Sequence, residues 1–223
     1  SGTGDNYTID SYNNVQFHTA ADMLPFGIVG KVAYAPDLDT YGSGNNSGVT
    51  ATEGTSSYVG RSATEMQISF DAIPMADGLK VGASYFERDE QGAATKRDAD
   101  AESGAYYATY SVGNISLGYS KAYNQLLVAD SANTGTDYYE QTNQSIAYSI
   151  NDDISISYEV EKSERVGVDA ATATVEQKST GVQLAYNLGG MTLAIARNTH
   201  DNPSYSTSAA DLEQTLFAVT MAF

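Results

Sequence analysis

The feature that most constrains the fold of this chain is an alternation of apolar with small or polar residues along many short segments. In the segment 154–160, ISISYEV, every second residue is apolar. The same period recurs in 79–85, in 182–188 and in 217–223. A period of two is the signature of a β-strand whose two faces meet different surroundings. The sequence therefore predicts an all-β protein.

The apolar segments are too short for a helical membrane protein. No stretch approaches the roughly 18 apolar residues that a membrane-spanning helix requires. A β-strand tilted in a bilayer needs only about 9 to 11 residues, and these can alternate. A membrane protein of this sequence would therefore cross the bilayer with strands.

The predicted connections between strands alternate in length. Short turn signals, rich in Gly, Asn, Asp and Pro, fall at 22–25, 74–78, 113–114, 151–153 and 189–190. Long polar connections lie between them at 36–62, 89–100, 125–137, 164–175 and 199–211. Short turns at one end of a sheet and long loops at the other are typical of a transmembrane β-barrel.

About eleven strands are expected between these connections, joined in order as antiparallel hairpins. Their ranges are near 13–20, 26–35, 63–73, 79–88, 103–112, 115–124, 138–150, 154–163, 176–188, 191–199 and 212–223.

Pairing the strands across their turns gives an internal check on this interpretation. If Ala72 faces Leu79, the outward positions of that hairpin are all apolar, and Asp71 faces Lys80 on the other side as a cross-strand ion pair. The hairpin that turns at Asn151 gives the same agreement. The predicted partners are Phe70 with Val81, Ile68 with Ala83, Met66 with Tyr85, Tyr148 with Ile156 and Ile146 with Tyr158.

Composition excludes several functions. Among 223 residues, 28 are acidic and 11 basic, which gives a formal net charge of -17. A nucleic-acid-binding protein needs a basic stripe that displaces counterions from phosphates, and no basic cluster is visible. The chain has no Cys, so thiol catalysis, thiolate metal sites and disulfides are excluded together. No cofactor is expected.

The main structural alternative is a water-soluble β-sandwich, because its strands would also alternate. Every predicted hairpin, however, keeps an apolar band of similar length. The opposite face lacks the bulky aliphatic residues that a packed interior demands. The pattern therefore favours a barrel whose apolar face meets lipid.

The last eight residues, Leu216 to Phe223, resemble the closing strand of Gram-negative outer-membrane barrels, which ends on an aromatic residue. The segment 27–36, GIVGKVAYAP, leads into a long loop and looks like general porins of the sixteen-strand type. The resemblance implies an up-and-down β-barrel in the bacterial outer membrane, surrounded by lipid that includes lipopolysaccharide. It also implies a homotrimer and recognition of Phe223 by the barrel-assembly machinery.

The strand count departs from the family pattern. A closed barrel of this family has an even number of strands, and an odd number leaves two unpaired edges in lipid. Residues 13–223 would then be strands six to sixteen, with five strands upstream. Residues 1–12 would be a remnant of the constriction loop that these porins fold into the lumen, with Asp5 and Asp10 as its carboxylates. A solvated linker fits the same twelve residues equally well.

The alternation assigns charged residues of both signs to the inner face of the barrel. The predicted pore-lining residues are Lys31, Lys80, Arg88, Glu65, Asp71, Glu159 and Glu161. Opposed charges across a water-filled constriction orient dipolar solutes and set ion preference. Charges on long loops act weakly there, because the Debye length is about 8 Å at physiological salt. The wall charges therefore determine ion preference. They are three positive and four negative, so we expect only a mild cation preference; the alternative is that these are ordinary hydrated wall residues.

Three basic residues continue the outward, lipid-facing parity: Lys121, Lys162 and Arg197. Each would cost about 2 to 4 kcal/mol at the bilayer midplane but only about 0 to 1 near an interface. They are therefore predicted at the loop-side rim, where they could reach lipid phosphates, with Tyr106 as a cation–π partner of Lys121. The alternative is a local bulge that turns them inward.

Outward aromatic residues are expected to form girdles at the membrane interfaces. They are Phe26, Tyr34, Phe70, Tyr85, Tyr119, Tyr158, Tyr186 and Phe223. Neither His18 nor His200 has metal-ligand spacing with a second His, and no nucleophile motif indicates a hydrolase. No metal site or catalytic residue is predicted.

These observations predict an outer-membrane channel that lets small hydrophilic solutes and ions diffuse through a water-filled lumen, without catalysis. A barrel that acts as a specific solute channel, a surface receptor or an adhesin is the main alternative. A row of lumen aromatics would favour a sugar channel, yet the predicted inner face offers only Tyr107 and Phe86. A soluble β-sandwich that binds a ligand is the third possibility.

Overall fold

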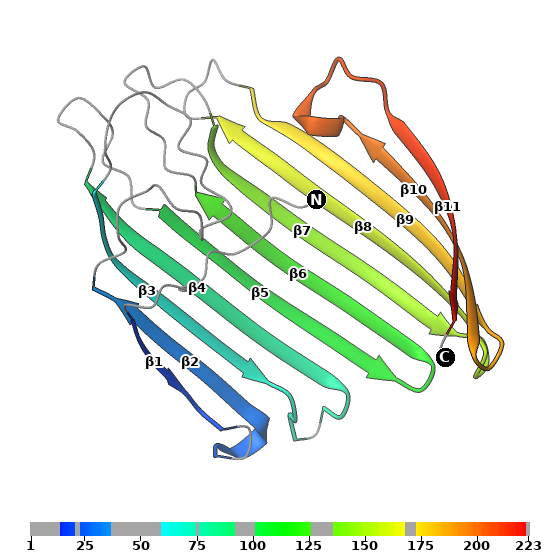
Figure 1. Cartoon of the computed structure of the whole chain (residues 1–223), viewed down its shortest axis with the longest axis horizontal. Helices are drawn as coiled ribbons and strands as arrows, with labels where there is room; N and C mark the ends of the chain where they lie inside the picture. The colour runs from blue at the N-terminus through cyan, green and yellow to red at the C-terminus, as the bar shows by residue number, and fades with distance from the viewer. Residues whose placement is uncertain are drawn as a thin grey trace.

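The computed structural model describes residues 14–20, 23–36, 59–74, 76–91, 101–125, 136–167 and 173–221. These ranges contain eleven strands (Figure 1). The strands are β1 (Val15–His18), β2 (Ile28–Ala35), β3 (Val59–Phe70), β4 (Leu79–Gln91), β5 (Ala101–Val112), β6 (Ile115–Gln125), β7 (Thr136–Ser149), β8 (Ile154–Gly167), β9 (Val175–Asn187), β10 (Met191–Asp201) and β11 (Leu212–Met221).

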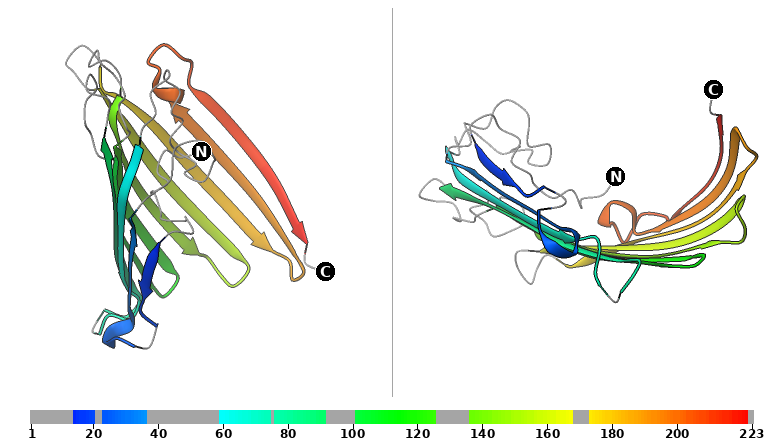
Figure 2. Two further views of the ribbon diagram at one scale, coloured as in Figure 1. Left: turned by 60° about the vertical axis from the view of Figure 1, so that its left-hand side comes forward. Right: turned by 90° about the horizontal axis from the view of Figure 1, so that it is seen from below.

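Every strand pairs with its neighbour in the sequence, so the fold is one antiparallel up-and-down sheet in the order β1 to β11. The all-β prediction and all eleven predicted strands are confirmed. The sheet twists and curves into a trough that does not close on itself (Figure 2). Within the described ranges no other strand covers the free edge of β1 or of β11.

The predicted registers of the β3–β4 and β7–β8 hairpins are both confirmed. Phe70 pairs with Val81, and the two pairs below it in β3 and β4 also match. Tyr148 pairs with Ile156. The ion pair predicted between Asp71 and Lys80 does not form, because the ladder of paired residues ends at Phe70 and Val81, one position short of them. Asp71 lies in the turn with an exposed side chain.

The strands are longer than predicted where they approach the long connections. β8 runs to Gly167 instead of 163, and β4 runs to Gln91 instead of 88. These extensions carry mostly polar residues, so the apolar alternation stops before the backbone ladder does. Register shifts occur in this zone, between Gly60 and Ala63 in β3 and between Thr136 and Tyr138 in β7.

Tight turns close the other end of the sheet. The backbone N–H groups of Asp153 and Ile154 donate to the side-chain oxygen of Asn151, a turn in which the Asn side chain replaces a backbone acceptor. Gly113 and Gly189 adopt positive φ, which a side chain at either position would strain. We call this the turn end of the sheet, and the end with the long connections the loop end.

The described residues contain a single sheet with no second sheet packed against it, unlike the sandwich alternative. The helical residues among them form only two 3-10 turns, η1 (Pro25–Gly27) and η2 (Pro203–Tyr205). No helix in this part of the chain has the length and apolar character that a membrane crossing needs. Buried apolar side chains are correspondingly few: Ala33, Ala35, Ala63, Phe86 and Val175.

Candidate functional site

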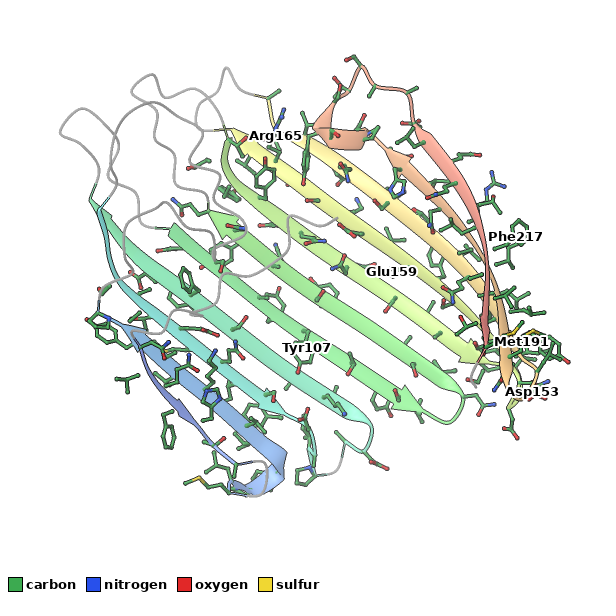
Figure 3. The ribbon with its side chains drawn as sticks, in the orientation of Figure 1. Tyr107, Asp153, Glu159, Arg165, Met191 and Phe217 are labelled. Atoms are coloured by element: carbon green, nitrogen blue, oxygen red, sulfur yellow. The ribbon has the colours of Figure 1, made fainter. Side chains whose placement is uncertain are left out.

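The sheet has two chemically different faces, which follow the predicted parity. The turn η2 lies on the concave side of the sheet in Figure 2, and its Tyr205 bonds to Ser163 of β8, so the face of Ser163 is the concave, inner one. Register places Lys31, Glu65 and Glu159 on this inner face, and Ile68 and Leu184 on the outer face. Figure 3 places Arg165 near the loop end, with Tyr107 and Glu159 further along the sheet. Because the outer face carries an apolar band and the inner face is mostly polar, the inner face is the candidate functional surface.

The outer face exposes large apolar residues on nearly every strand. They include Phe17, Val32, Tyr34, Met66, Ile68, Tyr106, Leu117, Tyr119, Ile146, Tyr148, Ile156, Tyr158, Val182, Leu184, Tyr186, Leu193, Ile195, Phe217, Val219 and Met221. A contiguous apolar surface of this extent marks a site of contact with lipid or with another protein. The predicted girdle residues Tyr34, Tyr119, Tyr158 and Tyr186 all belong to it.

A cavity of about 500 Å³ opens on the inner face of β1 to β5. Its polar wall contains Lys31 of β2 and Glu65 of β3, two of the predicted pore-lining residues. The Lys31 ammonium donates to Glu65 Oε1 at 2.8 Å, and the Gln67 side-chain amide donates to the same oxygen. Glu65 is 1% exposed and Lys31 is 18% exposed. The two opposite charges are therefore bonded on adjacent strands and do not face each other across a gap.

Two aromatic residues of the inner face behave differently. Tyr107 of β5 is 39% exposed, whereas Phe86 of β4 is 2% exposed and presents almost no surface to a solute. The Tyr107 ring lies over Gly82, its partner in register, so closely that a Cβ at Gly82 would meet ring atoms at 2.5 Å. Gly82 therefore provides the room in which the Tyr107 ring lies against the wall.

The remaining predicted wall charges lie along β4 and β8. Lys80 lies beside Thr109 of β5, and Glu159 is exposed on the inner face. Glu161, two residues further along β8, accepts a hydrogen bond of 2.6 Å from the Gln141 side-chain amide. The carboxylates of Glu159 and Glu161 thus lie two residues apart on the inner face of β8, and that of Glu161 accepts a hydrogen bond from an uncharged side chain.

The structure does not describe every predicted site residue. Asp5, Asp10, the whole of 1–12 and Phe223 lie outside the described ranges. Arg88 pairs with Ala63 and Ala101 in the register of β4, and its side chain is likewise outside the described part.

The three predicted rim cations lie on the outer face, each bonded to a glutamate of the next strand. Lys121 contacts Glu140 at 2.6 Å. Lys162 contacts Glu176 at 3.1 Å, and Arg197 contacts Glu213 at 2.8 Å. Register is continuous around Lys121, Lys162 and Arg197, which excludes the alternative of a bulge that turns them inward.

Each of these pairs joins the two strands that flank one long connection: β6 with β7, β8 with β9, and β10 with β11. Tyr106 lies beside Lys121 in register as predicted. The expected cation–π contact between these two described residues does not form; the Tyr106 ring packs at 6.2 Å against that of Tyr119. Glu140 takes the ammonium instead, because a carboxylate attracts it more strongly than a ring face does.

The inner face has more aromatic and cationic residues than the sequence indicated. Register places Tyr139 of β7 opposite Arg165 of β8 on this face, and Tyr205 of η2 contacts both. The sequence analysis missed Arg165 because this residue falls in a segment that was predicted as a loop. Tyr139 was also missed, although it lies in a predicted strand at the parity of Gln141 and Asn143, and this alternation is the signal that could have found it.

The two histidines do not meet. His18 bonds to Gln16 of the same strand, and the His200 ring bonds to the Ser179 hydroxyl at 2.9 Å. In the described part of the chain, no group of three His, Asp or Glu side chains is arranged to hold a metal ion. Comparison of the sequence with protein-family models and with curated proteins gave no match.

Proposed function

We propose that this chain forms wall strands of an outer-membrane porin, through which small hydrophilic solutes and ions diffuse without catalysis. The observation that carries the proposal is the segregation of the sheet's faces. One face exposes an apolar band from β2 to β11, the other is mostly polar, and no second layer covers either within the described ranges. A single sheet is stable in this form where lipid covers the apolar face and water the polar one.

Strand length and charge position support the same proposal. Strands β3 to β11 contain 10 to 14 residues, enough to cross a bilayer at a tilt. On the outer face of β8, Ile156, Tyr158 and Val160 precede Lys162 and Glu164 toward the loop end. The change from apolar to charged marks where hydrocarbon would give way to head groups.

The proposal includes closure of the sheet into a barrel. The backbone groups on the free edges of β1 and β11 would cost several kcal/mol each in lipid. Further strands, to the sixteen of the porins that the chain resembles, would pair with these edges. The same resemblance adds a homotrimer and assembly through Phe223 to the proposal.

Ion preference follows from the wall charges. Lys31 and Glu65 neutralise each other at 2.8 Å, so their fields largely cancel in the lumen. Glu159 and Glu161 remain close together on β8, against Lys80 on β4. We therefore expect a mild cation preference.

Channel recording tests this function directly. The complete protein, isolated from its own membrane in detergent, should migrate differently on a gel before and after heating. It should also give stepwise conductance in a planar lipid bilayer, with a reversal potential in a KCl gradient that indicates modest preference for K⁺. Solubility without detergent, or insertion without conductance, would refute the porin proposal; clear anion selectivity would refute the ion-preference part alone.

A solute-specific channel is the second candidate, and the exposed ring of Tyr107 on the inner face favours it. Sugar rings stack on aromatic faces, so a specific channel would show conductance that falls and saturates as a sugar is added. A general porin would show only the small, linear decrease that viscosity causes.

A further inference from the structure

The connection between β10 and β11 folds back over the inner face of the sheet. We call residues 202–211 the Tyr205 loop; it includes η2 and lies on the concave side of the trough (Figure 2). The Asn202 side-chain amide donates to the Glu176 carbonyl oxygen at 2.9 Å, and the Ser204 backbone N–H donates to Gln177 Oε1 at 2.9 Å. The base of the loop is therefore bonded to β9.

The Tyr205 side chain contacts β7 and β8, the next two strands of the wall. Its hydroxyl is 2.7 Å from the Ser163 hydroxyl. Its ring lies 5.2 Å from the ring of Tyr139, at an interplanar angle of 46°. Such tilted aromatic pairs are attractive. The phenol is thus bound at both its ring and its hydroxyl by residues of the wall.

The backbone of the loop is strained where it makes these contacts. Asn202, Ser204 and Tyr205 have φ of 50°, 58° and 55°, the left-handed region that residues with a side chain seldom adopt. Conformations of this kind persist where surrounding contacts over-determine them, and they cluster at functional clamps. The contacts with β7, β8 and β9 therefore hold this loop inward against its own backbone preference.

The cation beneath the Tyr205 ring is Arg165. Its guanidinium carbon is 5.8 Å from the ring centroid. Its Nε is buried without a hydrogen-bond partner, and within the described part of the chain no carboxylate pairs with it. Lys31 and the three rim cations, by contrast, each bond to a glutamate. The ring face of Tyr205 thus takes the place of a counterion.

We propose that the Tyr205 loop is a selectivity element at the loop-side mouth of the lumen, which narrows the mouth and covers the positive charge of Arg165. This inference rests on the porin function proposed above. With the ring in place, ions that pass the mouth meet a phenol, and the carboxylates of Glu159 and Glu161 determine ion preference. Without the ring, Arg165 would face the water of the lumen and favour anions.

Two variants separate the covering of the Arg165 charge from the narrowing of the lumen mouth. Tyr205→Ala should raise single-channel conductance and shift the reversal potential toward anions, because it both widens the mouth and exposes Arg165. Tyr205→Ala combined with Arg165→Gln should keep the higher conductance but lose the anion shift. A matched control is Tyr148→Ala, which removes an exposed ring from the outer face and should leave both quantities at wild-type values.

The outcomes distinguish this inference from the porin function. A wild-type protein that does not conduct refutes the porin function. A wild-type protein that conducts, with Tyr205→Ala equal to it in conductance and selectivity, refutes the inference alone. An anion shift that persists in the double variant shows that Arg165 is not the covered charge and also refutes it. Insertion of each variant is checked by heat-modifiable gel migration.

A chemical measurement gives an independent readout, because the chain has no Cys. Arg165→Cys should react slowly with a water-soluble methanethiosulfonate while Tyr205 is present, and several-fold faster in the double variant with Tyr205→Ala. Should Tyr205→Ala not insert, Ser163→Ala removes only the hydroxyl that holds the phenol. Reaction of Arg165→Cys must then be faster with Ser163→Ala than without it, and equal rates would refute the covering of Arg165.

Discussion

Two ion pairs of equal length, one on each face of the sheet, show how differently the faces use the same interaction. Lys31 with Glu65 and Arg197 with Glu213 both join neighbouring strands at 2.8 Å. The inner pair is 18% and 1% exposed, whereas both members of the outer pair are 64% exposed. The inner carboxylate depends on its partners for solvation, and the outer pair does not. The two ion pairs therefore differ in their contribution to stability, although their N–O distances are equal.

The positions of the pairs extend the comparison. The inner pair lies in the wall of the cavity formed by β1 to β5, next to Gln67. The outer pairs follow the apolar band toward the loop end, each beside a long connection. On the proposed function, the inner pair fixes charge inside the lumen, and the outer pairs mark where lipid hydrocarbon ends.

The largest expected effect comes from placing a charge within the apolar band. Leu184 pairs with Ile156 and Ile195 on the outer face. If lipid covers this face, Leu184→Arg should lower the free energy of unfolding by about 2 to 4 kcal/mol, the cost of an arginine at the midplane. The measurement is urea unfolding of the complete protein in lipid vesicles, followed by circular dichroism.

The adjacent residue supplies the control for this prediction. Gln183 lies on the inner face between Ser157 and Ala196, so Gln183→Arg should change stability by no more than about 0.5 kcal/mol. Equal effects of the two arginines would contradict the assignment of faces. A stable Leu184→Arg protein would contradict the contact with lipid, since a side chain exposed to water tolerates the change.

The second prediction concerns the inner pair. Lys31→Met removes the ammonium that donates to the buried Glu65 carboxylate at 2.8 Å, and the loss of one partner of a buried charged group costs about 1 to 3 kcal/mol. The double variant Lys31→Met with Glu65→Gln should recover part of the loss, because a neutral amide loses less than a buried carboxylate when the ammonium is removed. The same unfolding measurement applies. A loss in the double variant as large as the sum of both single losses would show that the two residues do not interact.

The sequence predicted the fold better than the site, because the fold depends on residues close together in the sequence and the site on residues far apart in it. Strand number, order and register follow from local alternation and from turn residues such as Asn151 and Gly189, which act within a few positions. Face assignment follows from parity and was correct for Lys31, Glu65, Glu159 and Glu161. Where the apolar alternation ended, as in 164–167, the strand continues in register with β7 but was not predicted.

The site depends on contacts that alternation does not encode. Parity put Lys31 and Glu65 on one face but did not show that they bond to each other. The partners of the rim cations required the register of β6 to β11 across long connections. The inward fold of the Tyr205 loop depends on tertiary contacts with Ser163 and Tyr139, which precede Tyr205 by about 40 and 65 residues. No sequence-local signal specifies such contacts.

The smallest expected effect tests the outer pairs. Arg197→Met removes the guanidinium and leaves Glu213 in contact with solvent, so the free energy of unfolding should fall by about 0 to 1 kcal/mol, less than for Lys31→Met. Added salt should shrink even this difference, because exposed charges are screened within about 10 Å at 0.1 M. Arg197→Lys, which keeps the charge, is the control and should match wild type in unfolding. A loss from Arg197→Met as large as that from Lys31→Met, and unchanged by salt, would mean that the outer pairs are embedded in a low-dielectric medium, and the boundary of the hydrocarbon would then lie beyond them toward the loop end.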